Sequence, residues 1–191
     1  SKHGIECLRS SKTPPEVATL MERAAGKACE FKDDAVDQAA FLWPGTKTAI
    51  LVDSKDERWL LRAAAFGAAV DTAVVAMDPS SSPPVEKLRA LGLSRIYLTV
   101  AFHPWRRALA NVAPELVEIS LPEDLISELL LRLSARPTVV VVTNPADQLG
   151  VFSPSSLSVL APLLSGVHRA PLWVTDEHDA EKIEAEVLKL I

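Results

Sequence analysis

The densest group of titratable side chains in the sequence is the run Asp176–Asp179, which reads Asp-Glu-His-Asp. It directly follows the apolar segment Pro171–Thr175, a predicted strand, and α/β proteins bind their ligands at the carboxyl ends of strands. Such a cluster is a candidate for holding a small ligand. The same acidic residues also suit the first turn of a solvated helix, where they complement the helix dipole, and the sequence favours this second interpretation.

Other polar side chains stand in equivalent places along the chain. Asp53, Asp78 and Asn144 each end a predicted strand, so that together with Asp176 they put polar groups on one edge of a parallel sheet. Each is also an ordinary turn residue, because Asp and Asn side chains hydrogen-bond to the backbone in turns. The pattern leaves two interpretations open, a crevice lined by four polar groups and a row of simple turns.

Several catalytic signatures are absent from the sequence. It has neither a G-x-G-x-x-G nor a G-x-x-x-x-G-K-[ST] phosphate loop, and its seven glycines offer little of the close backbone approach that such loops need. A G-x-S-x-G nucleophile elbow is also missing, and the four histidines show no H-x-x-x-H spacing. The sequence thus gives no support for phosphate-loop, α/β-hydrolase or zinc chemistry.

Short apolar runs in the sequence indicate the strands that would position the polar residues named above. Several of them, above all Val139–Val142, are continuously apolar rather than alternating, which is typical of strands buried on both faces of a parallel sheet. The predicted strands are Thr48–Asp53, Thr72–Asp78, Arg95–Val100, Leu116–Ser120, Thr138–Thr143 and Pro171–Thr175.

Helix-start signals lie between these strands. Ser54 and Glu57 have the spacing of a capping box, and Pro122 can occupy the first turn of a helix. Ser153-Pro154 opens a further helix, which Pro162 is expected to end or kink. The alternation of strands and helices predicts right-handed crossovers, and hence an α/β fold with three α/β/α layers and a mainly parallel sheet.

The first part of the chain lacks these strand signals. It predicts one helix over Glu16–Ala28 and a shorter one near Asp34–Leu42. No Gly/Ser-rich linker divides the chain, and its length suits one domain. Residues 1–191 are therefore predicted to form a single domain, with a helical lead-in over 1–46 and a βα core over 47–191.

The composition places limits on partners and location. The 25 acidic residues against 20 basic ones give a formal net charge of −5, and without a dense Lys/Arg run this argues against nucleic acid as the main partner. No apolar run approaches the roughly 18 residues of a membrane span, and the N-terminus lacks the apolar region of a secretory signal. Cys7 and Cys29 form no C-x-x-C pair, which suits a reducing interior. We expect a cytoplasmic domain that binds neither nucleic acid nor membranes.

Five short segments, collinear along the chain, carry a family resemblance. The segment 143–150, Thr-Asn-Pro-Ala-Asp-Gln-Leu-Gly, resembles the N-P-x-N-P-T-G motif of fold-type I pyridoxal-phosphate-dependent aminotransferases, and 174–179 is similar to their strand ending in D-E-x-Y. Segments 50–57, 71–80 and 11–17 are similar to the family's G-S-x-E strand, its G-D-x-V strand and the N-P-P-x-x-V entry of its histidinol-phosphate branch. The chain thus resembles the large domain of a class I/II, histidinol-phosphate-aminotransferase-like enzyme.

The resemblance implies which residues would surround a cofactor. In the family an aspartate pairs with the pyridine nitrogen and an asparagine contacts the phenolic oxygen, while a Gly-Ser pair holds the phosphate and an aromatic ring stacks on the cofactor. The aligned positions are Asp176 for the pyridine nitrogen, Asn144 and Asp147 in the N-P-x-N motif, Ser54 and Lys55 for the phosphate, Ser81 for the stacking ring and Asp179 for the tyrosine.

The same resemblance implies lost catalysis. The family attaches pyridoxal phosphate to a lysine beyond the D-E-x-Y strand, whereas Lys182 and Lys189 lie in the predicted last helix and the sequence ends at Ile191. At Asp147 a carboxylate replaces a neutral contact and would repel the anionic cofactor. We therefore expect a shortened, degenerate relative without a cofactor, acting in binding or assembly as a homodimer or with a protein partner.

Two alternatives stay open. One is an active pyridoxal-phosphate transferase with an atypical lysine, either Lys55 or a lysine from another chain. The other is a doubly wound domain that binds a small anion or nucleotide in the crevice outlined by Asp53, Asp78, Asn144 and Asp176. A lysine-linked cofactor with visible absorbance would identify the first, and ligand-induced stabilisation without covalent attachment would identify the second.

Overall fold

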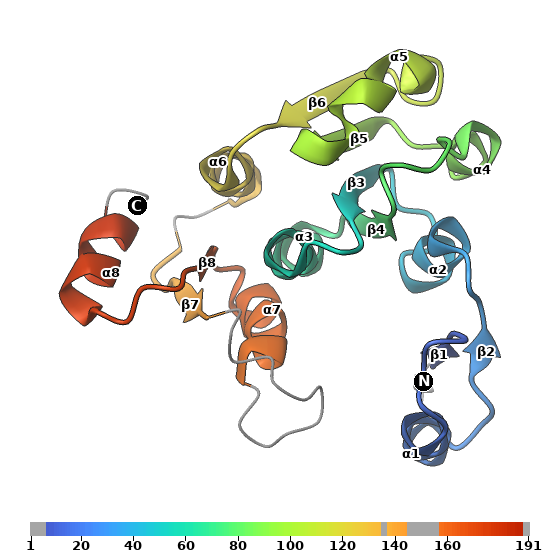
Figure 1. The fold of residues 1–191 in the computed structure, drawn as a ribbon, viewed down its shortest axis with the longest axis horizontal. Coiled ribbons are helices and arrows are strands. Elements are labelled where there is room, and N and C mark those ends of the chain that lie inside the picture. The colour runs from blue at the N-terminus through green and yellow to red at the C-terminus, as the bar shows by residue number, and fades with distance from the viewer. Residues whose placement is uncertain (1–6, 135–136, 145–156, 189–191) are drawn as a thin grey trace.

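The computed structural model describes residues 7–134, 137–144 and 157–188, and its fold is α/β (Figure 1). Four parallel strands form a central sheet in the order β4-β3-β5-β6. Each of them lies within one residue of its predicted bounds. The strands are β3 (Thr48–Asp53), β4 (Ala73–Met77), β5 (Arg95–Thr99) and β6 (Glu115–Ile119).

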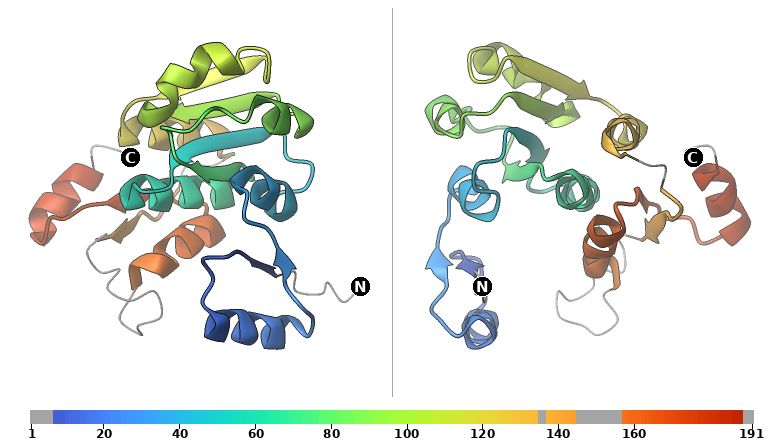
Figure 2. Two further views of the ribbon diagram at one scale, coloured as in Figure 1. Left: turned by 45° about the vertical axis from the view of Figure 1, so that its right-hand side comes forward. Right: turned by 180° about the vertical axis from the view of Figure 1, so that it is seen from behind.

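Helices cover both faces of the central sheet (Figure 2) and confirm the predicted α/β/α layers. One face packs against α3 (Glu57–Val70) and α6 (Pro122–Arg132), the second of which starts at its predicted proline. The opposite face packs against four shorter helices. These are α2 (Ala35–Leu42), α4 (Val85–Ala90), the 3-10 helix η1 (Val100–Trp105) and α5 (Arg106–Leu109).

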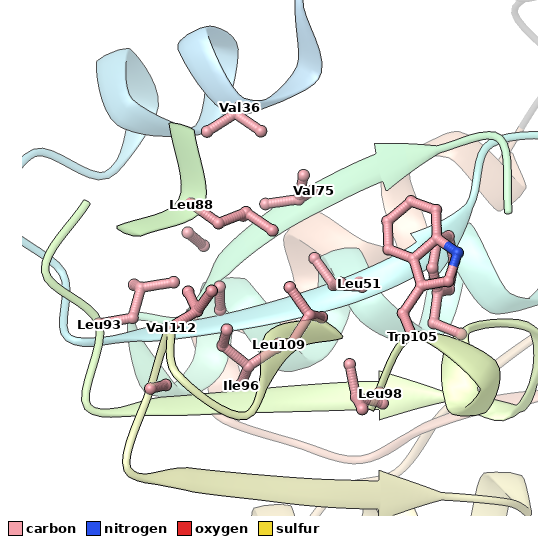
Figure 3. Close-up of a cluster of buried hydrophobic side chains, with 14 of the residues drawn as sticks. Val36, Leu51, Val75, Leu88, Leu93, Ile96, Leu98, Trp105, Leu109 and Val112 are labelled. Atoms are coloured by element: carbon pink, nitrogen blue, oxygen red, sulfur yellow. The ribbon is translucent and has the colours of Figure 1, made fainter. Parts of the chain in front are cut away.

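Alternation along the strands builds the two apolar layers. Leu51 of β3 packs in one cluster with Leu88 of α4 and Leu109 of α5 (Figure 3). Its neighbour Ile50 points to the other face and packs with Phe66 of α3. All of these side chains are almost completely buried, and each contributes roughly 1.5–3 kcal/mol of transfer free energy to folding. Burial on both faces explains why β3 is continuously apolar in sequence.

The last two strands form a second parallel sheet. β7 (Val141–Thr143), shorter than its predicted Thr138–Thr143, pairs with β8 (Leu172–Val174), and α7 (Leu157–His168) packs beside them. A third apolar cluster joins this unit to the side of α3 that faces away from the central sheet. The predicted sheet is therefore divided in two, because α3 lies between its halves (Figure 1).

Small residues allow α7 to come close to α3. An added Cβ at Gly166 of α7 would lie only 2.5 Å from the Cβ of Ala68 on α3. On the other side of α3, an added Cβ at Gly67 would lie 2.6 Å from the carbonyl oxygen of Thr72. Real Cβ atoms do not approach other heavy atoms so closely, so any larger residue at either glycine must push the elements apart.

The residues before α2 form a small unit of their own. Here α1 (Pro15–Ala25) connects two short strands that pair in parallel, β1 (Leu8–Arg9) and β2 (Glu30–Phe31), and a disulfide joins Cys7 to Cys29. Helices α1 and α2 match the two predicted helices, although α1 ends at Ala25 rather than at Ala28, and the strands β1 and β2 were not predicted. The disulfide corrects the expectation of reduced cysteines, because the fold brings together residues that are 22 positions apart. That residues 1–191 form one domain stays a prediction.

Two helix-end predictions differ from the structure. Asp56 rather than Ser54 caps α3, because its carboxylate accepts a hydrogen bond from the Trp59 N–H at 3.0 Å. The helix α7 continues through Pro162, so this proline does not end the helix, which was one of its two expected effects. The predicted start at Ser153-Pro154 lies outside the described residues.

The chain closes with α8 (Ala180–Val187), whose side chains are all at least partly exposed. Ile183 and Val187 lie on one face of it, as predicted from their spacing. None of the helices in the described ranges has the length and apolar character needed to cross a membrane.

Reduction of the Cys7–Cys29 disulfide is expected to loosen the N-terminal unit and leave the core folded. The bond closes a loop whose opening should cost about 3 kcal/mol of local stability, and no residue before Ala35 belongs to the three apolar clusters described. Limited trypsinolysis with mass spectrometry should show faster cleavage at Arg23 and Lys27 after reduction. A variant with both cysteines changed to serine should behave alike without reductant. Loss of the whole thermal transition would contradict this.

Filling the close contact between α3 and α7 is expected to destabilise the C-terminal unit. Gly166→Ala should lower the free energy of unfolding by about 1–3 kcal/mol, because the new methyl group meets a rigid alanine rather than a flexible side chain. Chemical denaturation measures this change. The neighbouring Val167→Ala is the control, and because that side chain is exposed its effect should stay within about 0.5 kcal/mol. Equal effects of the two would contradict the packing argument.

Candidate functional site

The carboxyl ends of β3 and β4 carry a compact group of charged side chains. Lys55 Nζ lies 2.6 Å from Asp78 Oδ2, and the Lys55 backbone N–H donates to Asp53 at 2.9 Å. The backbone N–H and the hydroxyl of Ser80 also donate to Asp78, at 3.0 and 2.7 Å. The hydrogen bonds from Lys55 and Ser80 hold the pKa of Asp78 well below its usual range, and Asp78 in turn raises the pKa of Lys55.

Ser54 and Ser81, which the resemblance aligns with phosphate and ring positions, make backbone connections. The N–H of Ser54 donates to the carbonyl of Met77 at 2.8 Å, and the hydroxyl of Ser81 donates to the carbonyl of Asp78 at 2.7 Å. The first bond ties the loop after β3 to β4, and the second closes the turn after β4. Asp78 thus serves as the turn residue that its type predicts.

The run Asp176–Asp179 leads into α8, and this confirms its interpretation as a helix start. Asp179 is the N-cap, and its carboxylate accepts from the N–H groups of Glu181 and Lys182 at 3.0 and 3.4 Å. The carboxylate of Glu177 accepts from the N–H groups of Asp179 and His178 at 3.1 and 2.9 Å, which lowers the pKa of Glu177.

Two arginines of α3 connect that helix to the end of β8. Arg58 forms an ion pair with Asp176. One turn later, Arg62 donates to the carbonyl of Val174 at 3.1 Å and lies over the Trp59 ring. Burial, reinforced by the charge of Arg58, lowers the pKa of Arg62, and its Nε is buried without a hydrogen-bond partner among the described residues. Sequence analysis missed this pair, although the i, i+4 spacing in a predicted helix was a usable signal.

A hollow of about 450 Å³ opens at the carboxyl ends of β7 and β8. Its apolar lining comes from β7, α7 and α8, and its polar lining is Thr143, Asn144, Thr175, Glu177 and His178. The volume lies in the range of roughly 300–1,000 Å³ that is typical of small-molecule sites. Asp147, the neighbour of Asn144 in the aligned motif, lies outside the described residues.

The side chains that the resemblance aligns with a cofactor contact other side chains in this structure and lie at two separate places. Asp176 would have to face the pyridine nitrogen but is paired with Arg58, and Lys55 would have to face the phosphate but is paired with Asp78. The described positions also fall into two groups. Ser54, Lys55 and Ser81 lie at the ends of β3 and β4, whereas Asn144, Asp176 and Asp179 follow β7 and β8.

Helix α7 reverses the usual amphipathic pattern. The side that packs toward α3 and β8 carries small residues, of which Ala161 and Ser165 are buried and Gly166 meets Ala68. The opposite side carries large apolar residues whose exposed fractions run from 49% to 70%. We call these the outward face of α7, and they are Leu160, Leu163, Leu164 and Val167. Sequence analysis missed this surface, although the i, i+3, i+4, i+7 spacing was its signal.

Comparison with known proteins identifies no relative, so the functional conclusion depends on the geometry described above. No protein-family model, no curated protein and no solved structure matches the chain. Within the ranges that the structure describes, no group of three or more His, Cys, Asp or Glu side chains is arranged to hold a metal ion. The similarity to aminotransferases therefore stays a prediction.

Removal of the Lys55 charge is expected to return the pKa of Asp78 toward its ordinary value of 3.8. Because the pKa of Asp78 is depressed in the folded state, the ion pair contributes stability above that value and loses it as the pH falls toward the folded pKa. Carboxyl-carbon NMR titration of Lys55→Met should show the upward shift. Lys12→Met, which removes an exposed charge elsewhere, is the control, and an unchanged Asp78 titration in Lys55→Met would contradict the assignment.

Proposed function

We propose that this chain is a non-catalytic binding domain, built on an aminotransferase-like scaffold, that associates with protein through the outward face of α7. The observation that carries the proposal is the reversed pattern of α7, which buries small residues and exposes three leucines and a valine. Single exposed apolar residues are common on protein surfaces, but a contiguous stripe of them marks an interaction site. Covering this stripe removes apolar surface from water, which drives association.

The state of Lys55 supports a non-catalytic function over an active transferase. A lysine attacks a carbonyl compound only as the neutral amine, and enzymes achieve this by lowering the lysine pKa. Here the carboxylate of Asp78 lies 2.6 Å from Nζ and raises the pKa of Lys55, which holds the amine in its charged form. Lys55 is therefore poorly suited to form a covalent link with pyridoxal phosphate.

The hollow beside β7 and β8 supports a second candidate function, the binding of a small ligand. Its volume and its mixture of apolar walls with Asn144 and His178 are of the right kind. Glu177 on the same wall has a lowered pKa and stays ionised, so a small anion or nucleotide would meet a negative charge there. Since Leu160 and Leu164 line the hollow as well as the outward face, the hollow serves better as an extension of a protein-binding surface.

The cytoplasmic location stays a prediction, and the disulfide weighs against it. Disulfides persist in oxidising compartments and are rare where glutathione keeps thiols reduced. Protein isolated from its source with the thiols alkylated at lysis should therefore contain the Cys7–Cys29 bond if the domain works in an oxidising compartment, and two alkylated cysteines if it is cytoplasmic.

Titration with pyridoxal phosphate tests the non-catalytic assignment. We expect no saturable visible absorbance, and borohydride reduction should leave only scattered adducts on exposed lysines, because Lys55 and Asp176 are engaged with internal partners. Mass mapping locates the adducts, and Lys55→Met is the control that should leave the pattern of the other adducts unchanged. Saturable absorbance with a single modified lysine would overturn the proposal and identify an active transferase.

A further inference from the structure

We propose that the partner of the outward face of α7 is a basic amphipathic helix of another protein. Its apolar side would cover the leucines of α7, and its lysine or arginine side chains would meet the carboxylates around α8. This inference rests on the proposed function, since it names the chemistry of the partner of the same surface. The site consists of the outward face together with the adjoining hollow of about 450 Å³.

The outward face and the hollow form one continuous apolar surface. Leu160 and Leu164 belong to the outward face and also line the hollow, where Val142 of β7 and Ile183 of α8 join them. Strands β7 and β8 lie between α7 and α8 (Figures 1 and 2). The exposed fractions of Val142, Leu160 and Leu164 lie between 42% and 49%. A partner that covers these side chains therefore removes apolar surface of two elements from water at once.

The shape of this surface favours a helical partner. The four residues of the outward face span seven positions, which is about 10 Å along one side of a helix. A straight apolar stripe bordered by a hollow suits an amphipathic helix, which lays its own apolar side along such a surface. Helix α7 contains no Asp, Glu, Lys or Arg, so the centre of the contact desolvates none of these charges on this chain.

The negative charge of the protein is concentrated beside this surface. The segment 176–186 holds six carboxylates and one basic residue, Lys182. Arg58 of α3 offsets one of the carboxylates through its ion pair with Asp176. The rest of the sequence has 19 of the 25 acidic residues and 19 of the 20 basic ones, so the segment accounts for the whole formal net charge of −5.

Three of these carboxylates belong to residues at or beside the hollow. Glu177 lines it, and Asp179 and Glu186 stand four and three positions from Ile183, which places them next to that residue on α8. Lys182 lies 3.4 Å from Glu177 and 3.9 Å from Asp179, and its single charge compensates only part of theirs. A basic side chain of the partner would therefore be attracted to this place, and an acidic one would be repelled.

The same charge disfavours other occupants of the surface. An anionic lipid membrane would be repelled by the acidic segment. A second copy of the chain has no excess of positive charge to offer, since its sequence is balanced outside 176–186. The apolar stripe and the charge beside it thus agree on one kind of partner, which combines apolar and basic side chains.

Binding of designed peptides to the full chain tests the inference. The probe is a crosslinked helical peptide of about 14 residues, which is about 21 Å long, with leucines on one side and lysines on the other. The comparison peptide carries glutamates in place of the lysines. Fluorescence anisotropy should give a micromolar dissociation constant for the lysine peptide, which rises with salt, and binding of the glutamate peptide should be about tenfold weaker or less.

A change in the apolar stripe tests the location of the peptide. Leu164→Asn removes an apolar contact without adding a charge, and it should weaken binding of the lysine peptide about fivefold or more. Leu131→Asn is the matched control, since Leu131 is a leucine of α6 with an exposed fraction of 80%, and it should leave binding unchanged. Circular dichroism verifies that both variants are folded.

Removal of carboxylates tests the charge. Glu177→Gln combined with Glu186→Gln should weaken binding of the lysine peptide about threefold or more at low salt, and should reduce the salt dependence. Glu16→Gln combined with Glu30→Gln removes two exposed carboxylates from the N-terminal unit and should change neither quantity.

Equal binding of the two peptides, or binding that Leu164→Asn does not weaken, overturns the basic helix as partner. Dimerisation of the chain through α7 in sedimentation overturns it too, and so does binding to phosphatidylcholine vesicles that Leu164→Asn abolishes, because the surface then has another occupant. A preference for the glutamate peptide that still depends on Leu164 overturns the basic partner but leaves protein association through α7 standing. The pyridoxal-phosphate titration tests the non-catalytic assignment separately.

Discussion

The packing of α3 between two parallel sheets is the constraint on which the rest of the structure depends. One side of the helix, with Ala63 and Phe66, covers the central sheet, and the other side, with Leu61 and Ala65, receives α7 and β8. A helix with apolar residues on two sides is stable only when both sides are buried. The alanines keep α3 thin enough for both neighbours to approach, and glycine at Gly166 allows the closest contact.

Because of this arrangement, polar contacts at the carboxyl end of β8 connect the second sheet to α3, and we call these contacts the joint. Arg58 and Arg62 lie in the first turns of α3 and reach Asp176 and the carbonyl of Val174, so these groups at the end of β8 are bound to side chains of α3. Because Arg62 is partly buried, loss of its partners would leave a desolvated charge, which costs more than loss of an exposed ion pair. The joint therefore fixes the second sheet against α3 at the edge where α/β proteins usually bind ligands.

A structural feature could be predicted from the sequence only where it produces a recognisable pattern within a short segment. Strand β3 was predicted to the residue, because burial on both faces requires a continuous apolar run. The division into two sheets produces no such pattern. The run Val139–Val142 looks like any buried strand and does not show that α3 lies between this strand and the central sheet. The Cys7–Cys29 bond and the contact of Arg58 with Asp176 depend in the same way on distant segments that only the fold brings together.

The candidate surface on α7 was predictable in pattern but not in direction. A period of 3.6 residues places Leu160, Leu163 and Val167 on one side of the helix, yet it does not tell which side faces the core. The close approach to Ala68 decides the question, because leucines turned inward could not fit where an added methyl at Gly166 already lies 2.5 Å from its neighbour. The orientation of α7 thus has two consequences. Its small residues pack tightly against α3, and its large apolar residues are exposed. The leucines therefore keep much of their apolar surface exposed, and covering that surface, as the proposed function requires, would gain free energy.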